Sequence, residues 1–289
     1  MDKYFFAGAG VLVGLTVLIA VLAGTGGDSF TAQEKAAVIP LDGQITSTSS
    51  SFNTQSITPS RVRELNTRAR NSGASVVIYE WNSGGGAVVA SKEIRREIES
   101  LEMTTICRFR DVAASGAYLA SLGCDRIVAD SASITGSIGV KSSYMEFSEL
   151  MEELGVEYVN ITSGSLKDVG SPYRNTTKED RKVLQEKTDI IHEEFVEDVR
   201  TERNLTQSQV EEVRTGEIFL GTQAKQLGLV DKLGGRQTAV SEAENMTGTE
   251  LKTETVEIEP EFSLLSLLNA KSSLASMLGS TNIVEAAWR

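Results

Sequence analysis

A serine in a turn of small residues is the first candidate for chemistry in this 289-residue sequence. Ser115 lies in the stretch AASGA and directly precedes a short helical pattern. Small residues let a backbone approach a substrate or another backbone closely. A serine in this place can cap the helix, fill space or act as a nucleophile, and as a nucleophile its hydroxyl needs a base.

The single histidine of the chain restricts the choice of that base. His192 lies in a long charged helical pattern, DIIHEEFVEDVR, where we expect it to face solvent. A Ser-His-Asp hydrolase or a histidine-rich zinc site would have to be built around this one residue. We therefore expect a different general base, and we expect neither a metal nor a cofactor.

A lysine can replace histidine as the base if its amine is neutral. An unperturbed lysine has a pKa of about 10.4, and burial lowers the pKa of such an amine. Lys167 lies on a loop and could serve, and Ser137, in the stretch TGSIG, could hold its amine by a neutral hydrogen bond. A glycine turn at 84–86 could supply backbone N–H groups to an oxyanion. Because these residue types are common, their spacing alone identifies no site.

Strand-like runs alternate with helical patterns along most of the chain. The runs span 36–41, 75–81, 104–109, 125–129, 157–162 and 253–258, and the helical patterns span 61–71, 88–102, 118–122, 145–154, 177–202, 206–213 and 236–245. This alternation indicates an α/β fold with a mostly parallel sheet covered by helices. Ligands bind beyond the carboxyl ends of such strands, and the turns at 82–86 and 113–117 both follow strands. We expect the site at that edge.

The N-terminal residues have the composition of a membrane anchor. Residues 4–23 contain no charge, and a helix of this length, at about 1.5 Å per residue, spans a hydrocarbon core of about 30 Å. An uncleaved anchor is favoured over a cleaved signal peptide, because the following residues offer no strong Ala-x-Ala site. We assign 1–24 to a single-pass transmembrane anchor and 25–35 to a linker. We expect the short N-terminal tail before the anchor to stay in the cytoplasm, which places the main domain outside the cytoplasm.

Charge and cysteine content narrow the class of protein further. The net charge of −12 argues against nucleic acid or anionic lipid as a general partner. Cys107 and Cys124 lack zinc-site spacing, and the sequence favours two buried free thiols over a disulfide. Trp81 and Tyr118 are expected in the core.

The tail at 248–289 contains an apolar, serine-rich stretch that is too polar for a second transmembrane helix. Docking on a neighbouring subunit and partial disorder both stay open for this tail.

Three stretches, taken in order, carry a resemblance to a known family. They are NSGGGAVVASKEI from residue 82, DVAASGAYLASLGCDRIVADSASITGSIGV from residue 111 and SGSLKDVGSPYR from residue 163. Over about residues 36–240 the chain resembles the signal peptide peptidase A family of membrane-anchored serine proteases, peptidase family S49, in its short single-domain branch. The resemblance implies a Clp protease/crotonase-like α/β fold of repeated β-β-α units, preceded by one transmembrane helix, with the protease domain at 36–247.

The resemblance also implies roles for individual residues. Ser115 matches the nucleophile, Lys167 the general base and Ser137 the residue that positions the lysine. Asp168 is then expected to point away, since a carboxylate beside the amine would raise its pKa. The oxyanion donors match the glycine turn and the amide after the nucleophile, at Gly85, Gly86 and Gly116. Two positions depart from the family pattern, with Gly84 where proline is usual and Ala117 where glycine is usual.

The function that the resemblance implies is that of a serine endopeptidase with a Ser/Lys dyad, which degrades cleaved signal peptides and similar apolar peptides. It implies a location in the cell membrane with the catalytic domain outside the cytoplasm. Short members of the family resemble rings in which serine and lysine meet across an interface, which predicts a homo-oligomer with shared active sites. Two alternatives stay open: a related protease that cuts a specific membrane-protein partner, and a catalytically dead membrane scaffold on the same fold.

Overall fold

The computed structural model of the chain describes residues 34–48 and 56–258. The predicted anchor at 1–24, nearly all of the predicted linker and residues 259–289 of the predicted tail lie outside these ranges. The predicted end of the domain at 247 is too early, because Leu251–Thr255, in the predicted tail, form a strand that pairs with the first strand of the sheet. Among the residues that are described, no helix combines the length and the apolar character needed to cross a bilayer.

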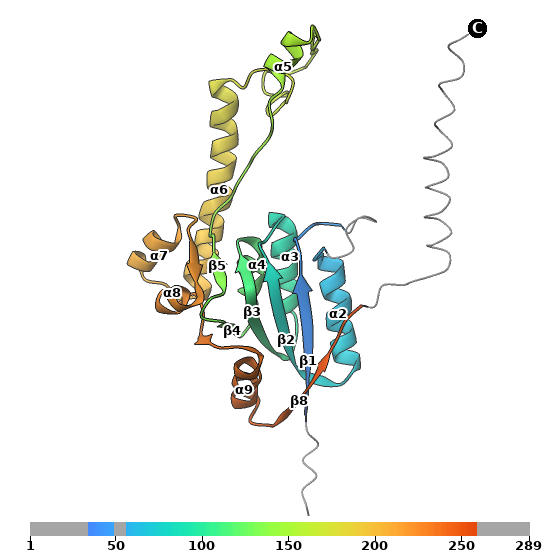
Figure 1. Cartoon of the computed structure of the whole chain (residues 1–289), viewed down its shortest axis with the longest axis vertical. Coiled ribbons are helices and arrows are strands. Elements are labelled where there is room, and N and C mark those ends of the chain that lie inside the picture. The colour runs from blue at the N-terminus through green and yellow to red at the C-terminus, as the bar shows by residue number, and fades with distance from the viewer. Residues whose placement is uncertain (1–33, 49–55, 259–289) are drawn as a thin grey trace, which may run out of the picture.

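The described residues form one mixed sheet in the order β6-β5-β3-β2-β1-β8, in which β4 also pairs with β3 and β7 (Figure 1). Every pairing is parallel except that of β5 with β6, so the predicted mostly parallel sheet is confirmed. The long strand β3 pairs with β4 along its first half and with β5 along its second half. The strands are β1 (Glu34–Asp42), β2 (Ala74–Ser83), β3 (Thr104–Ala114), β4 (Arg126–Ala129), β5 (Ile134–Gly136), β6 (Ile218–Leu220), β7 (Lys232–Leu233) and β8 (Leu251–Thr255).

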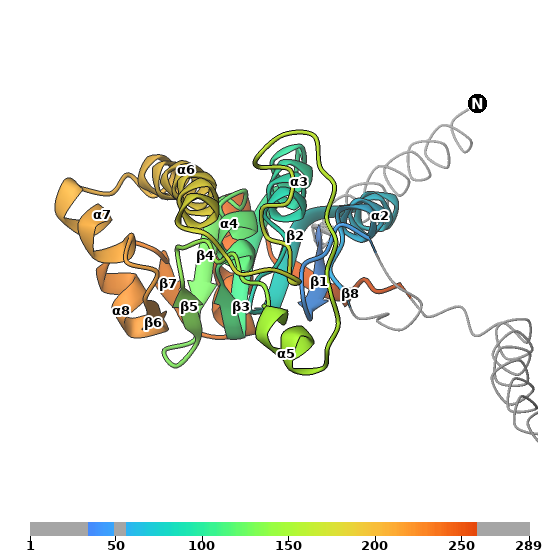
Figure 2. The same ribbon diagram turned by 90° about the horizontal axis from the view of Figure 1, so that it is seen from above.

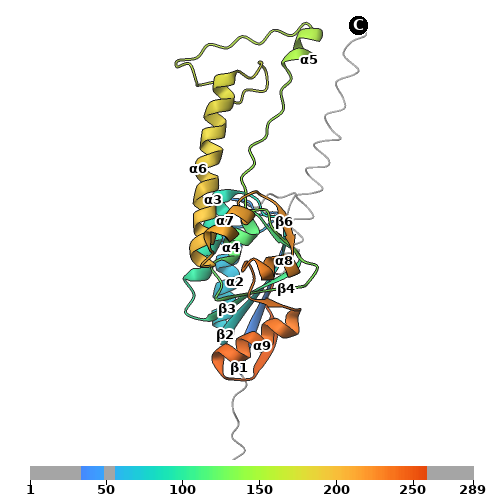
Figure 3. The same ribbon diagram turned by 90° about the vertical axis from the view of Figure 1, so that its left-hand side faces the viewer.

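Helices cover both faces of the sheet. Helices α2, α3 and α4 lie on one face and α9 lies on the other (Figures 2 and 3). The long helix α6 begins at a capping box between Thr177 and Asp180, which agrees with the helix start predicted at 177. The helices are α2 (Pro59–Asn71), α3 (Val88–Glu99), α4 (Gly116–Ser121), α5 (Ser148–Glu153), α6 (Lys178–Glu202), α7 (Gln207–Val213), α8 (Gly221–Gln226) and α9 (Arg236–Thr247).

The alternation of side chains along the strands divides the core in two. One face of the central strands, including Ile39, Tyr79 and Trp81, packs under α2, α3 and α4. The other face contributes a smaller apolar cluster that includes Val38 and packs against α9. Trp81 and Tyr118 are both fully buried, which confirms their predicted place in the core.

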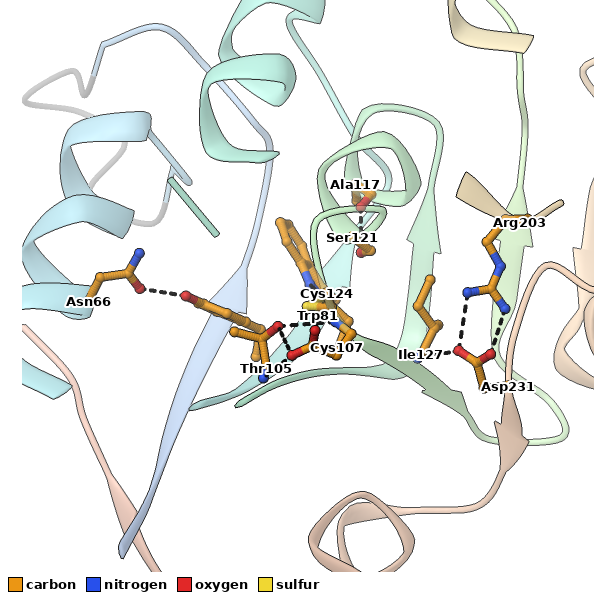
Figure 4. The surroundings of a disulfide bond; sticks show 12 residues. Asn66, Trp81, Thr105, Cys107, Ala117, Ser121, Cys124, Ile127, Arg203 and Asp231 are labelled. Carbon is orange, nitrogen blue, oxygen red and sulfur yellow. Dashed lines mark hydrogen bonds and ion pairs between the residues drawn. A yellow bond between two sulfur atoms is a disulfide. The ribbon is translucent and has the colours of Figure 1, made fainter. Parts of the chain in front are cut away.

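The prediction of two free thiols is wrong, because Cys107 and Cys124 form a disulfide (Figure 4). Cys107 lies on β3 and Cys124 follows the end of α4, where the chain has turned back beside the strand. Their Cα atoms are 5.7 Å apart, within the range that a disulfide spans. The indole Nε1 of Trp81 donates a hydrogen bond of 3.2 Å to the sulfur of Cys107.

Removal of this disulfide is expected to destabilise the domain by about 3 kcal/mol, because the bond closes a loop of 17 residues and restricts the unfolded chain. Denaturant unfolding of the wild type and of Cys124→Ala measures the difference. A reducing agent should lower the stability of the wild type and leave Cys124→Ala unchanged. Equal stability of the two proteins under oxidising conditions would contradict this expectation.

A second difference concerns the predicted strand at 157–162. This segment has no regular structure and is exposed throughout, because no strand of the sheet lies beside it. It belongs to a long excursion, residues 141–177, which we call the arm. The arm carries α5 and stands away from the sheet together with the N-terminal half of α6 (Figures 1 and 3).

Candidate active site

Ser115 lies at the junction of β3 and α4 in a conformation that is costly for any residue except glycine. Its φ is 55° and its ψ is −124°. Its amide donates a hydrogen bond of 2.8 Å to the carbonyl of Gly136 on β5. The hydroxyl makes no capping bond to α4, so capping does not explain the serine. Strain of this kind is typical of functional sites, which favours the nucleophile hypothesis.

The predicted glycine turn packs directly against Ser115. Gly85 has a φ of 96°, and a Cβ on it would lie 2.6 Å from the nitrogen of Gly116 and 3.0 Å from the Cβ of Ser115. A Cβ on Gly86 would lie 2.0 Å from the carbonyl oxygen of Ile45. Since atoms cannot approach this closely, only glycine fits at either position.

The amides around this turn differ in what they already bind. The N–H of Gly85 donates to the hydroxyl of Ser83 at 3.1 Å. Gly116 is the first residue of α4, so its N–H has no partner within the helix. The nitrogen of Gly86 is its neighbour, since a Cβ on Gly116 would lie 3.1 Å from that nitrogen. The amides of Gly86 and Gly116 are therefore better placed than that of Gly85 to donate to an oxyanion.

Ser137 opens onto the same cavity as Ser115, as the sequence predicts for two residues of one site. Its φ of 50° is again unusual for a residue with a side chain, and its amide donates to the carbonyl of Glu217 at 2.8 Å. The cavity has a volume of about 470 Å³. Its lining consists of Gly84, Ser115, Ser137, Gly139, Val140, Lys141, Gln185, Thr188, Asp189, His192, Arg214, Thr215 and Gly216.

A small apolar recess adjoins Ser115 on the side of α3 and α6. It encloses about 20 Å³ and is lined mostly by glycines and apolar side chains, including Leu119 and Phe195, together with Lys92 and Ser115. The ammonium group of Lys92 forms an ion pair with Glu194 on α6. The recess therefore presents a hydrocarbon surface next to the candidate nucleophile.

His192 does not face solvent as predicted. It is half-buried and lines the cavity of Ser115 and Ser137, and its Nε2 lies 3.2 Å from the carbonyl oxygen of Ile138. Helix α6 crosses over the segment that follows β5, and this crossing turns the histidine inward. The charged pattern of the helix contains no signal for such a contact.

The structure does not bring Lys167 to Ser115 within one chain. Lys167 is exposed and is not among the described residues that line the cavity. Its segment, between α5 and α6, lies at the end of α6 that is farthest from the sheet (Figure 1). The predicted base thus lies on the arm, away from the edge of the sheet that carries the predicted nucleophile.

An arginine ties the segment of Lys167 to the start of α6. The guanidinium of Arg174 donates to Asp168 at 2.9 Å and to Asp180 at 2.5 Å. Asp168 therefore forms an ion pair with Arg174. The hydrogen bond from Arg174 also holds the pKa of Asp180 well below its usual range. The ionised carboxylate of Asp180 therefore stabilises the fold at pH values above the usual pKa of a carboxyl group. This stabilisation is lost as the pH falls through the lowered pKa.

The arm exposes many large apolar side chains to solvent. Met145 and Val159 are more than two-thirds exposed, and Ile161 is 94% exposed. Exposed apolar groups of this density are typical of a surface that another chain covers. The members are Tyr144, Met145, Phe147, Leu150, Leu154, Val156, Tyr158, Val159, Ile161, Leu166 and Tyr173.

Comparisons with known proteins identify the family of the chain. The sequence model of peptidase family S49 matches residues 100–250. A protein of Enterococcus faecium named as a signal peptide peptidase SppA is 40% identical over 167 residues, which cover 57% of this chain and 48% of that protein. A protein of Synechocystis sp. named as a protease is 34% identical over 214 residues, which cover 72% of this chain and 77% of that protein.

The extent of these similarities differs between relatives. The chain spans about half the length of the Enterococcus protein and 55% of a protein of Methanocaldococcus jannaschii named as a protease. Among solved structures, a mutant of the 1510-N membrane-bound stomatin-specific protease in complex with a substrate peptide superposes with a TM-score of 0.51. The superposition covers 83% of this chain and 99% of that one at 13% identity, so this likeness concerns the fold.

Proposed function

The chain belongs to peptidase family S49, and from this premise we propose that it is a serine endopeptidase whose nucleophile is Ser115. One observation carries the proposal. Ser115 is held in a strained conformation, with a φ of 55°, against a turn in which only glycine fits. A residue that merely filled space or capped α4 would gain nothing from that conformation.

In the proposed reaction the hydroxyl of Ser115 attacks the carbonyl carbon of a peptide bond, and the amine of Lys167 accepts the hydroxyl proton. The lysine must be neutral at that moment, and the Ser137 hydroxyl positions it by a hydrogen bond. The negative charge on the carbonyl oxygen is met by backbone N–H groups at the glycine turn. Gly86 and Gly116 are favoured as donors, because among the described residues the amide of Gly85 already donates to Ser83; Gly85 shapes the turn. The lysine then returns the proton to the leaving amine.

Lys167 must come from another copy of the chain in this scheme. The arm carries the lysine away from its own Ser115 and presents a large apolar surface. A homo-oligomer in which the arm of one subunit packs on the next would bury this surface and deliver the lysine. We therefore propose shared active sites, with a single subunit inactive.

The proposed substrates are cleaved signal peptides and similar apolar peptides. The recess beside Ser115 is apolar and small, so it fits the side chain of a small apolar residue at the cut bond. The proposed location is the cell membrane, held by the segment at 1–24, with the catalytic domain outside the cytoplasm. Two observations support this placement: a relative is named as a signal peptide peptidase, and disulfides persist mainly in oxidising compartments.

Covalent labelling with a serine-directed phosphonate probe tests the proposal. The assembled full-length protein should be labelled at Ser115 and should cleave apolar leader peptides. Cleavage of intact membrane proteins but not of leader peptides would favour a partner-specific protease. Assembled protein that is neither labelled nor active would contradict a peptidase and favour a scaffold.

His192→Ala is expected to lower kcat/KM by about fivefold, because it removes one hydrogen bond, worth about 1 kcal/mol, from the segment that follows Ser137. His192→Gln can still donate a hydrogen bond and should keep most of the activity. Arg200→Gln, at an exposed position of the same helix, serves as the control. If His192→Ala lost as much activity as Ser115→Ala, the histidine and not the lysine would be the base.

A further inference from the structure

A second and larger cavity lies on the α9 face of the sheet and shares no residue with the cavity of Ser115. Its volume is about 640 Å³. Four arginines line it, which is unusual in a chain whose net charge is −12. They come from three elements, α2, β3 and α9, and are Arg61, Arg108, Arg110 and Arg236.

The strand register explains why charged side chains meet here. Pro40, Glu80 and Arg108 lie side by side across β1, β2 and β3. This row follows the apolar row that begins with Val38, which packs against α9. Helix α9 covers the apolar row, and the charged row borders the cavity.

Glu80 forms ion pairs with two of the arginines. It is almost fully buried, and its two oxygens accept hydrogen bonds from Arg236 at 2.8 Å and 2.5 Å and from Arg108 at 3.2 Å. Burial raises the pKa of Glu80, but the hydrogen bond from Arg236 and the nearby guanidiniums outweigh it, so the pKa is lowered overall. Asp42 holds Arg110 in a similar way, at 3.2 Å. The guanidiniums are therefore fixed in place.

The cavity has more guanidinium N–H donors than its own acids accept. A guanidinium carries five N–H donors, and Arg108 and Arg110 each donate to one carboxylate among the described residues. The Nε of Arg108 is buried and has no hydrogen-bond partner within the described part of the chain, which is rare in folded proteins. The lining contains four arginines but only three acids, Asp42, Glu80 and Glu257.

We propose that this cavity binds a phosphate-bearing anion, with phosphate oxygens accepting hydrogen bonds from Arg108 and Arg110. Phosphate offers several acceptor oxygens to guanidiniums that approach from different directions. The remaining volume and the apolar side chains of Val38, Pro40 and Ile258 accommodate an organic group attached to the phosphate. A soluble phosphate ester and the headgroup of an anionic lipid share this chemistry.

Titration of the full-length protein in a neutral detergent tests the site. Glycerol 3-phosphate, added at constant ionic strength against chloride, should bind saturably with a Kd in the millimolar range or below. Arg110→Gln should weaken this binding by about tenfold, since it removes a charged hydrogen bond. Arg110 is 38% exposed, so its substitution leaves the core intact. Arg200→Gln, a surface arginine paired with Glu197 outside the cavity, should bind as the wild type does.

Co-sedimentation with phosphatidylglycerol vesicles, compared with phosphatidylcholine vesicles, distinguishes the two sources of phosphate. Binding of glycerol 3-phosphate that Arg110→Gln weakens supports a soluble ligand. A preference for phosphatidylglycerol that Arg110→Gln removes, without binding of glycerol 3-phosphate, supports a lipid headgroup. If neither probe binds, or if Arg110→Gln binds both as the wild type does, the proposal is overturned.

Discussion

Ser115→Ala is expected to lower kcat for cleavage of an apolar leader peptide by about 10³-fold or more, because it removes the attacking oxygen. The substitution keeps the Cβ atom, so the backbone conformation and the fold should be unchanged. Circular dichroism and the thermal midpoint Tm measure the fold, and a peptide-cleavage assay measures kcat. A variant that folded normally and kept a tenth of the activity would exclude Ser115 as the nucleophile.

Ser115→Gly gives this prediction a matched control. With a φ of 55° and a ψ of −124°, the position is strained for alanine and relaxed for glycine. Relief of that strain is expected to make Ser115→Gly more stable than Ser115→Ala by about 1 kcal/mol, although both lack the hydroxyl. If the two variants were equally stable, the strain that supports the assignment of the nucleophile would be absent in solution.

The second large effect is the recovery of activity from two inactive variants. Lys167→Ala should be as inactive as Ser115→Ala, because the serine has no base. In an assembly of both variants, however, a Lys167→Ala subunit supplies an intact serine and its Ser115→Ala neighbour supplies an intact lysine. Random assembly of equal amounts then makes about one site in four complete, if each site joins two neighbouring subunits.

Co-expression with two different affinity tags, followed by sequential purification, isolates these mixed assemblies for the cleavage assay. The double variant Ser115→Ala/Lys167→Ala, co-expressed with Ser115→Ala, is the control and should stay inactive. Mixed assemblies that are fully inactive would mean that serine and lysine of one chain must meet. Full activity of Lys167→Ala alone would remove the lysine from the mechanism.

The parts of the fold that depend on local periodicity were predictable from the sequence. The apolar runs of β1 and β2 and the amphipathic pattern of α2 lie within a few residues of their predicted bounds, and β3 begins where predicted but extends to Ala114 instead of ending at 109. The start of α6 was marked by the capping residue Thr177. Each of these signals is contained in a short stretch of chain, and tertiary packing reinforced it.

Most of the errors concern contacts between distant parts of the chain. The segment at 157–162 has the composition of a strand, but a strand also needs a neighbour, and the described sheet supplies none. The bond between Cys107 and Cys124 depends on how α4 folds back along β3. The inward position of His192 depends on where α6 crosses the chain after β5. Strand β5 has only three residues and was missed because so short a run carries no periodicity.

For the candidate site, the structure brings together Ser115, Ser137 and the glycine turn, because each follows the carboxyl end of a strand at one edge of the sheet. Lys167 lies on no such strand, so the topology of a single chain does not determine its place in the site. That residue was found only through its motif, and its role stays a prediction until the mixed assemblies are measured.

The disulfide encloses the candidate nucleophile in a covalent ring, because Ser115 lies between Cys107 and Cys124 in the sequence. A single backbone cut inside that ring leaves the two fragments joined through sulfur. Self-cleavage or proteolytic nicking there would pass unseen on a non-reducing gel and would appear as two bands only after reduction. Peptide mapping of a labelled Ser115 therefore requires prior reduction and alkylation.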